Sequence, residues 1–299
     1  MKLLRFITDP VIRFSYLNEI GLFRYWSDAK FLKYKYKLVF GHKLNLENPQ
    51  TFNEKLQWLK LYDRKPIYTT MVDKYAAKEY VAERIGEEYI IPTLGIWNSF
   101  DDIDFENLPK QFVLKCTHDS GGLVICTDKD IFDKEVAKRK IKKCLKRNYY
   151  WSGREWPYKD VPRKIIAEKY IEDETGQLRD YKLYCFNGKP KIIMINSDRE
   201  IGKTKADYFD MDYNWLDLKW GYEHAPVKPL MPTNFEKMKE LAAILSKGIP
   251  ELRVDFYEVD NKIYFGELTF FDGSGFDEIE PKEWDKKLGD LIKLPYKKR

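Results

Sequence analysis

The sequence predicts an α+β fold, in which helices alternate with pairs of antiparallel strands. Polar and apolar residues alternate with period two within residues 112–127, 164–195 and 252–269, and each of these segments contains a short turn. Between them stand segments with apolar residues at helical spacing. Antiparallel strands need only a short turn, whereas parallel strands need a crossover of about a dozen residues, so this pattern favours hairpins over a parallel sheet.

The composition is that of a globular protein without a dominant charge. The chain has 299 residues, of which 43% are hydrophobic and 16% aromatic, enough for the core of one large domain or two smaller ones. It carries 53 Lys and Arg against 48 Asp and Glu, a formal net charge of +5. This weak bias does not indicate a nucleic-acid partner, and it is compatible with nucleotides or acidic glycans as ligands.

Cysteine spacing and hydropathy suggest a cytoplasmic location. The cysteines at positions 116, 126, 144 and 185 show no CxxC spacing and are expected to be reduced core residues. No apolar run approaches the ~20 residues of a membrane span, and the apolar start is too short for a signal peptide. We expect the first segment to be a packed helix interrupted at Pro10, with a peripheral membrane contact as the alternative.

Residues 1–66 are expected to form a helical N-terminal segment. One helix should begin at Thr51, where Glu54 stands at the capping-box position. A second should run from an N-cap at Asp73 to Gly86, which places Lys74 in its first turn. A cation at a helix N-terminus opposes the helix dipole, so Lys74 is an unusual choice for stability alone.

Hairpins dominate the middle of the chain. Strands at 112–116 and 123–127 are joined by the polar loop 117–122, which ends in two glycines. A basic amphipathic helix is expected at 133–147, and strands follow at 164–171, 179–186 and 189–195. The last two strands are joined by Asn187-Gly188, a strong hairpin signal. A helix at about 234–247 leads into the last hairpin.

That last hairpin, 253–269, carries polar residues where a core strand should be apolar. A three-residue loop at 260–262 would set Asp255 opposite Glu267 and Arg253 opposite Thr269, with Phe265 on the same face as Glu267. Two facing carboxylates are destabilising unless a cation lies between them, and oxygen ligands suit Mg²⁺. The alternative is an exposed hairpin whose charges are simply solvated.

The order of these elements resembles the ATP-grasp family. A closer resemblance, to the TupA-like branch named for teichuronopeptide biosynthesis, lies in residues 51–62, 72–81, 86–94 and 112–119. The resemblance implies an ATP-grasp fold over residues 67–299, in which two α+β subdomains clasp ATP. The lid subdomain would span about 88–170 and the metal-binding core subdomain about 171–290. The N-terminal domain usual in ATP-grasp ligases is not visible in residues 1–66.

The resemblance also implies roles for individual residues. Two lysines and a mobile glycine loop would hold the phosphates, while the end of the strand at 164–171 would hold adenine and ribose. The implied nucleotide-binding residues are Lys74, Lys115, Ser120, Gly121, Gly122, Glu168, Tyr170, Ile171, Glu172, Asp173 and Lys182.

Asp255 and Glu267 resemble the family's metal ligands, and Thr269 replaces the usual Asn. Arg253 and Lys115 would stabilise the transferred phosphoryl group, and His118 would act as a base or contact phosphate. On the substrate side we expect Arg199, as a carboxylate contact, and Ser274, in the glycine-rich loop 272–275.

These roles imply an ATP-dependent carboxylate-amine ligase that works through an acyl phosphate with one or two Mg²⁺ ions. The branch implies a pathway of bacterial surface (capsular) polysaccharide synthesis, with an amine or amino acid joined to a uronic acid or similar carboxylate. Three alternatives stay open: a glycan or small-molecule kinase, a nucleotide-sugar-dependent glycosyltransferase, and a non-catalytic nucleotide or glycan sensor.

Overall fold

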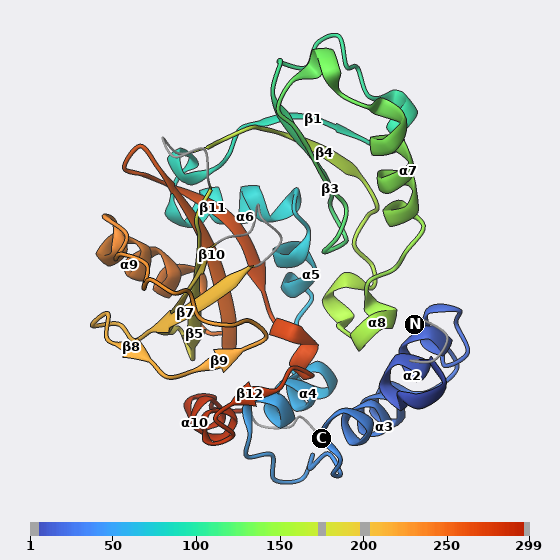
Figure 1. Ribbon diagram of the computed structural model, residues 1–299, viewed down its shortest axis with the longest axis vertical. Helices are drawn as coiled ribbons and strands as arrows, with labels where there is room; N and C mark the ends of the chain where they lie inside the picture. Colours follow the sequence, from blue (N-terminus) through green and yellow to red (C-terminus); the bar gives the residue numbers. More distant parts are fainter. Residues whose placement is uncertain (1–5, 173–177, 198–203, 296–299) are drawn as a thin grey trace.

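Two antiparallel sheets, with helices beside and between them, build the molecule (Figure 1). The structure is a computed structural model that describes residues 6–172, 178–197 and 204–295. Its mixture of helices and antiparallel hairpins confirms the predicted α+β class. Asp173 and Arg199, expected to bind ribose and a carboxylate, lie outside the described residues.

Helices form the first part of the described chain: α2 (Pro10–Glu19), α3 (Asp28–Phe40), α4 (Phe52–Tyr62), α5 (Ile67–Val72) and α6 (Ala76–Ile85). Thr51 and Glu54 make the predicted capping box at the start of α4. Helix α6 begins later than predicted. The Asp73 carboxylate accepts hydrogen bonds from the backbone N–H groups of Tyr75 and Ala76, so Lys74 precedes the helix instead of lying in its first turn.

The first sheet has the order β1-β4-β2-β3. Its strands are β1 (Thr93–Trp97), β2 (Phe112–Cys116), β3 (Leu123–Cys126) and β4 (Ile165–Lys169). Helix α7 (Lys134–Leu145) packs on β2 and β3, and its residues Ala137, Ile141 and Cys144 join the apolar side chains of this sheet in a core of their own. The short helix α8 (Tyr150–Gly153) follows.

The second sheet has the order β11-β10-β5-β6-β7-β8 and contains the largest core. Its strands are β5 (Asp180–Phe186), β6 (Lys189–Ser197), β7 (Lys205–Phe209), β8 (Trp215–Leu216), β10 (Glu251–Val259) and β11 (Lys262–Thr269). Helix α9 (Phe235–Leu245) packs on β5, β6 and β10. Strands β9 (Lys219–Trp220) and β12 (Ile279–Glu280) pair separately, and α10 (Glu283–Leu291) packs on α4. Short 3₁₀ helices lie at Glu87–Tyr89, Phe100–Asp102, Lys129–Ile131, Trp156–Tyr158 and Asp272–Gly275.

The last hairpin reaches the predicted pairing by a different route. Arg253 pairs with Thr269 and Asp255 with Glu267, as expected. The turn, however, has two residues, Asp260 and Asn261, whose φ values of 51° and 59° are left-handed. The odd residue is Gly266, in a β-bulge between the two halves of the ladder.

The bulge changes which residues share a face of β11. Phe265 pairs with Phe256 and lies in the core, whereas Glu267 pairs with Asp255. The expectation that Phe265 and Glu267 share a face is therefore wrong, because strand alternation is interrupted between them.

Candidate active site

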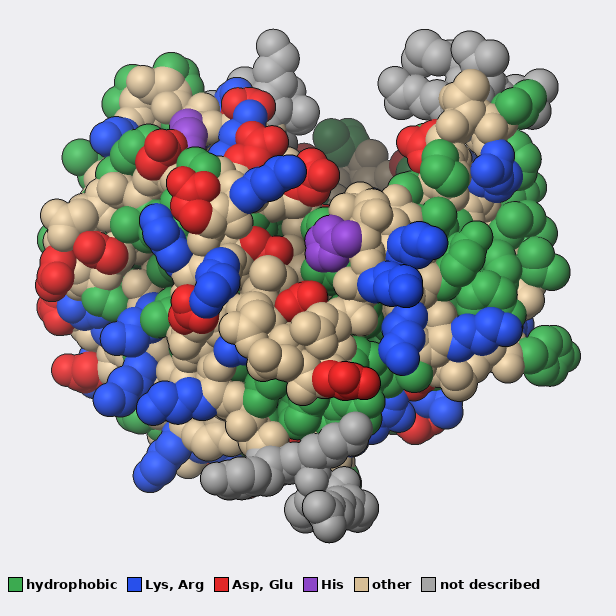
Figure 2. All heavy atoms as spheres, turned by 90° about the horizontal axis from the view of Figure 1, so that it is seen from below, with side chains coloured by type: hydrophobic (Ala, Val, Ile, Leu, Met, Phe, Trp, Pro, Cys, Tyr) green, Lys and Arg blue, Asp and Glu red, His purple; other side chains and the backbone are tan. Residues whose placement is uncertain are grey.

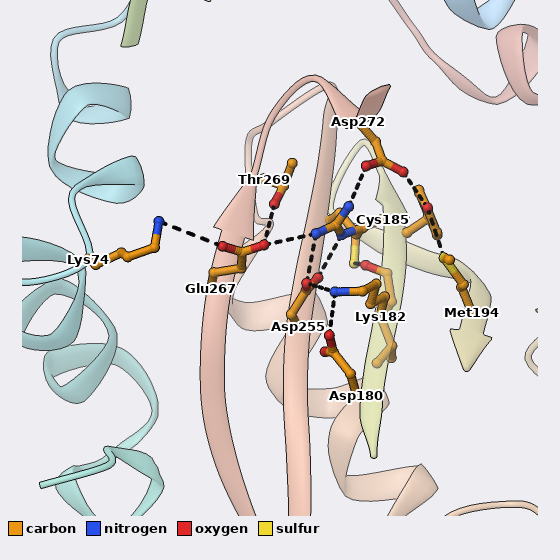
Figure 3. A network of polar contacts seen from close by, with 12 residues as sticks. Lys74, Asp180, Lys182, Cys185, Met194, Asp255, Glu267, Thr269 and Asp272 are labelled. Carbon is orange, nitrogen blue, oxygen red and sulfur yellow. Dashed lines mark hydrogen bonds and ion pairs between the residues drawn. The ribbon is translucent and has the colours of Figure 1, made fainter. Parts of the chain in front are cut away.

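Buried Arg253 is the centre of an ionic cluster on the second sheet, and Figure 3 labels its partners Asp255, Glu267 and Asp272. Its Nε lies 2.7 Å from Asp255 Oδ1, one terminal nitrogen lies 3.0 Å from Glu267 Oε1, and the other contacts the carboxylate of Asp272. Lys182 on β5 adds contacts to Asp180, at 2.7 Å, and to Asp255. We call these six residues the Arg253 cluster.

Ionisation within this cluster is mutually supported. Burial disfavours charge on Asp255, but Arg253 and Lys182 outweigh it and hold its pKa below the ordinary value. Burial and the charge of Arg253 likewise disfavour charge on Lys182, yet the surrounding carboxylates raise its pKa. Asp255 and Lys182 are therefore both charged near neutral pH.

The cluster fits a divalent cation only in part. Four carboxylates meet two cations, so a formal excess of two negative charges is available. Asp255, however, is 1% exposed, and both of its oxygens already contact cations, whereas the Glu267 side chain is 40% exposed. Thr269 Oγ1 lies 3.4 Å from Glu267 Oε1.

No closed metal cage exists among the described residues, since no three His, Cys, Asp or Glu side chains converge there on one point. The arrangement suits Mg²⁺ that takes most of its ligands from phosphate and water, with Glu267 as the accessible protein ligand. Use of Asp255 as a second ligand would require it to give up part of its contact with Arg253 or Lys182.

A second ionic group joins the first sheet to helix α6. Glu168 on β4 is 4% exposed, and its carboxylate lies 2.5 Å from Lys115 Nζ and 2.6 Å from Lys78 Nζ. Burial opposes ionisation of Glu168, but the charges of Lys115 and Lys78 hold its pKa below the ordinary value. Two cations face one carboxylate, which leaves a positive charge to attract phosphate. The side chain of Glu168 is thus committed to lysines, not free to face adenine.

Lys74 touches both halves of the site. Its Nζ donates a hydrogen bond of 2.9 Å to the carbonyl of Asp119 in loop 117–122. The same Nζ lies 4.0 Å from Glu267 Oε2 on β11 (Figure 3). Its backbone N–H also bonds to the Thr117 carbonyl. One side chain therefore connects the glycine loop of the first sheet with the Arg253 cluster of the second.

The loop 117–122 divides into an inner and an outer part. Ser120 lines a cavity of about 850 Å³ that Arg253 and Glu267 also line. His118 is instead buried, 1% exposed, with Nε2 3.2 Å from the Cys144 carbonyl, and burial lowers its pKa. Its expected role as a base or phosphate contact does not agree with this position, because the ring packs against helix α7.

Gly122 and Gly121 differ in surroundings. A Cβ on Gly122 would lie 2.6 Å from Cys116 Sγ, whereas a Cβ on Gly121 would meet nothing within 4 Å. The carbonyl of Gly122 also accepts the Cys116 N–H at 2.8 Å. Gly122 therefore anchors the end of the loop and Gly121 lies free at its tip.

The remaining predicted residues lie in three places. Tyr170, Ile171 and Glu172 follow β4, where the Tyr170 hydroxyl bonds to the Glu172 carboxylate at 2.8 Å. Lys182 belongs to the Arg253 cluster. Ser274 contacts Lys60 of α4, at 3.0 Å between Oγ and Nζ, and does not line the large cavity. Its expected substrate contact is therefore not supported.

Sequence reasoning missed three partners: Lys78, Asp180 and Asp272. Lys78 carried a usable signal, because it follows Lys74 by four residues and so projects from the same side of the predicted helix. Asp180 stands two residues before Lys182 on one strand face, which is a similar signal. Asp272 carried none, since its contact with Arg253 depends on the path of the loop after β11.

The sequence match to known families covers most of the chain. The family model TupA-like ATPgrasp matches residues 54–293. The sequence has no significant match among curated proteins.

Solved structures give looser similarities. D-alanine–D-alanine ligase from Bacillus anthracis complexed with ATP is 17% identical with a TM-score of 0.41, and the alignment covers 75% of this chain and 63% of that one. The chain thus spans less than two thirds of that ligase.

Two further structures are similar to the same degree. A RimK domain ATP-grasp protein from Sphaerobacter thermophilus DSM 20745 is 11% identical with a TM-score of 0.42, covering 77% of this chain and 70% of that one. D-cycloserine synthetase DcsG is 14% identical with a TM-score of 0.41, and the alignment covers 76% of this chain and 72% of that one. Because these values are low, family membership rests on the sequence match. The chain belongs to the TupA-like ATP-grasp family.

Proposed function

We propose that this enzyme joins a carboxylate to an amine through an acyl phosphate during synthesis of a bacterial surface (capsular) polysaccharide. The observation that carries the proposal is Lys74, whose ammonium group reaches both the glycine loop and Glu267. A cation in this place can bind phosphates held between the two sheets. The large cavity beside Arg253 supplies room for the acceptors.

The chain's own groups would divide the work on ATP. Lys74 and Lys115 would hold the phosphates, together with backbone N–H groups of Ser120, Gly121 and Gly122. Glu168 would orient Lys115 and Lys78 toward the same anion. Backbone groups of Tyr170 and Ile171, with the carboxylate of Glu172 or Asp173, would hold adenosine.

Arg253, with Lys115, would stabilise negative charge on the phosphoryl group during transfer. We propose Glu267, Asp255 and Thr269 as the residues that hold one or two Mg²⁺ ions, which when bound would neutralise the phosphates. Lys182 would support this site by keeping Asp255 ionised.

The reaction would proceed in two balanced steps. A carboxylate oxygen of the first substrate attacks the γ phosphorus, the bond to the ADP oxygen breaks, and ADP leaves. The amine of the second substrate then attacks the acyl carbon, phosphate leaves, and the amine loses a proton as the amide forms. Enclosure by loop 117–122 would protect the acyl phosphate from water.

The cavity lining suggests the chemistry of the acceptors. Tyr222, which is 44% exposed, offers an aromatic face to a sugar, and Asp277, Glu278 and Glu280 offer carboxylates to an ammonium group. These residues support a uronic acid or similar carboxylate joined to an amine or amino acid. Arg199 stays a prediction as the carboxylate contact.

We further propose a cytoplasmic enzyme, in contact with the inner face of the membrane, where surface glycans are assembled. In this proposal residues of about 88–170 act as the lid and about 171–290 as the metal-binding core, preceded by the helical segment 1–66. The nucleotide would lie between lid and core, with Lys74 at their junction.

Product analysis tests this function. A ligase should form ADP and phosphate only when a carboxylate and an amine are both present, and mass spectrometry should show an amide. A kinase would instead leave phosphate on a single hydroxyl acceptor. Thermal stabilisation by UDP-sugars but not by Mg·ATP would refute both of these readings in favour of a glycosyltransferase.

A further inference from the structure

The turn between the N-terminal helices α2 and α3 exposes large apolar side chains. Ile20, Leu22 and Tyr25, in the turn between α2 and α3, are 63%, 58% and 99% exposed. The opposite sides of these helices are fully packed, with Phe31 and Tyr36 buried. The exposed residues are thus not left over from a poorly formed core. Exposed apolar groups that gather in one segment often mark a binding surface.

A lysine-rimmed groove lies on α3 beside this turn. A cavity of about 610 Å³, the α3 groove, is lined by the aromatic rings of Trp26 and Tyr34 and by Lys30, Lys33, Lys37 and Lys43. Figure 2 shows hydrophobic side chains gathered over the N-terminal helices with Lys and Arg side chains beside them on one face of the molecule.

The groove lysines form no ion pairs within the described part of the chain. All four are exposed, and no described carboxylate forms an ion pair with any of them. The acidic residue of the same helix, Asp28, is turned away, since its carboxylate is bound by Arg64 at 2.6 Å and by the Tyr150 hydroxyl at 2.5 Å. Lys30 Nζ lies 4.5 Å from the centroid of the Trp26 ring within the groove. The groove therefore presents positive charge that no described carboxylate neutralises.

We infer that the α3 groove and the adjoining apolar turn dock on an anionic lipid bilayer. Lysines would bind lipid phosphates while Tyr25, Leu22 and Ile20 enter the interfacial layer, the combination that holds peripheral proteins on membranes. A soluble acidic ligand would engage the lysines but would leave these apolar side chains in water. Within residues 6–172, 178–197 and 204–295, no helix is long and apolar enough to span a bilayer.

Vesicle co-sedimentation of the full chain tests this docking. We expect binding to phosphatidylcholine vesicles that contain phosphatidylglycerol, and little binding to phosphatidylcholine alone. Each basic residue near a charged surface contributes roughly fivefold, so Lys30→Glu/Lys33→Glu/Lys37→Glu should weaken partitioning by on the order of 100-fold or more. Added salt should weaken binding of the unmodified chain.

A matched control comes from α7. Lys140→Glu/Lys143→Glu/Lys146→Glu changes the net charge equally on another exposed basic helix, and it should leave vesicle binding within about twofold because those charges lie away from the contact. The variant Leu22→Ser/Tyr25→Ser should weaken binding while keeping its salt dependence. Both replaced side chains are exposed, so folding should be unaffected.

Three results would overturn the inference. The groove variant could bind as well as the unmodified chain, or both triple variants could lose binding equally, which would indicate net charge alone. The groove variant could also change the sedimentation coefficient of the free protein, which would assign the surface to a second copy of the chain. A milder variant, Lys30→Gln/Lys33→Gln/Lys37→Gln, keeps the test valid if charge reversal disturbs folding.

Discussion

Arg253 contacts three carboxylates with one planar group, and a lysine could not reproduce those contacts. We predict that Arg253→Lys lowers kcat by on the order of 100-fold or more, because charge at the transferred phosphoryl group is left without a positioned donor. ADP release at saturating ATP measures the effect. Arg139→Lys, an exposed change on α7, should leave kcat unaltered. Retention of full activity by Arg253→Lys would contradict the proposed role.

The ionisation of Glu168 predicts how the unfolding free energy depends on pH. Its pKa in the folded protein lies below the ordinary value, since Lys115 and Lys78 outweigh the cost of burial. Its charge therefore stabilises the fold above its ordinary pKa, and this contribution is lost as pH falls through the lower folded value. The difference in unfolding free energy between the unmodified chain and Glu168→Gln should shrink below pH ~4.5. Urea unfolding across this range measures it, and a difference independent of pH would refute the assignment.

At the scale of elements, the glycine loop after β2 offers an internally matched pair of substitutions. Gly122→Ala would force its new methyl group against Cys116, so we predict a loss of roughly 1–3 kcal/mol in unfolding free energy and weaker ATP binding. Gly121→Ala meets open space and should change stability by less than about 0.5 kcal/mol. Thermal melting with and without Mg·ATP compares the two. Equal effects would show that the loop is not anchored at Gly122.

The sequence was most informative where a pattern is local. The capping box at Thr51, the turn at Asn187-Gly188 and the pairing of Asp255 with Glu267 all follow from spacing within one element or hairpin. The position of the bulge at Gly266 did not, because a turn residue and a bulge residue shift the register equally.

Contacts between distant segments were beyond the same reasoning. Burial of His118 depends on helix α7, and the contact of Ser274 depends on α4, more than 200 residues earlier in the chain. No local spacing encodes which distant element will pack over a side chain. The contacts of Glu168 with Lys115 and Lys78 are an intermediate case. The sequence allows these residues to be identified, but it does not show that the two lysines meet at one carboxylate.

At the scale of the whole molecule, buried Lys60 holds three distant segments together. Its Nζ bonds to Gln57 within α4, at 3.1 Å, to the Gly153 carbonyl of α8, at 2.8 Å, and to the Ser274 carbonyl, at 2.6 Å. The charge of buried Glu155 also acts on it. The N-terminal helices are thereby fixed to the loop beside the Arg253 cluster.

We predict that Lys60→Met lowers the unfolding free energy by about 3–5 kcal/mol, because two buried carbonyls lose their hydrogen-bond donor and buried Glu155 loses a nearby positive charge. Guanidinium unfolding measures this loss. Lys65→Met removes a half-exposed lysine nearby and should cost less than about 1 kcal/mol. A small effect of Lys60→Met would show that water or another group can replace the ammonium.

The bulge at Gly266 decides which face of β11 carries Glu267. If Gly266 entered the regular ladder, it would pair with Asp255, and Glu267 would pair with Val254 and turn toward the core. Natural relatives that lack the bulge should therefore also lack one residue between the positions of Phe265 and Glu267. The turn at Asp260-Asn261 can change in length without this effect, because a longer loop leaves the pairs of the ladder unchanged.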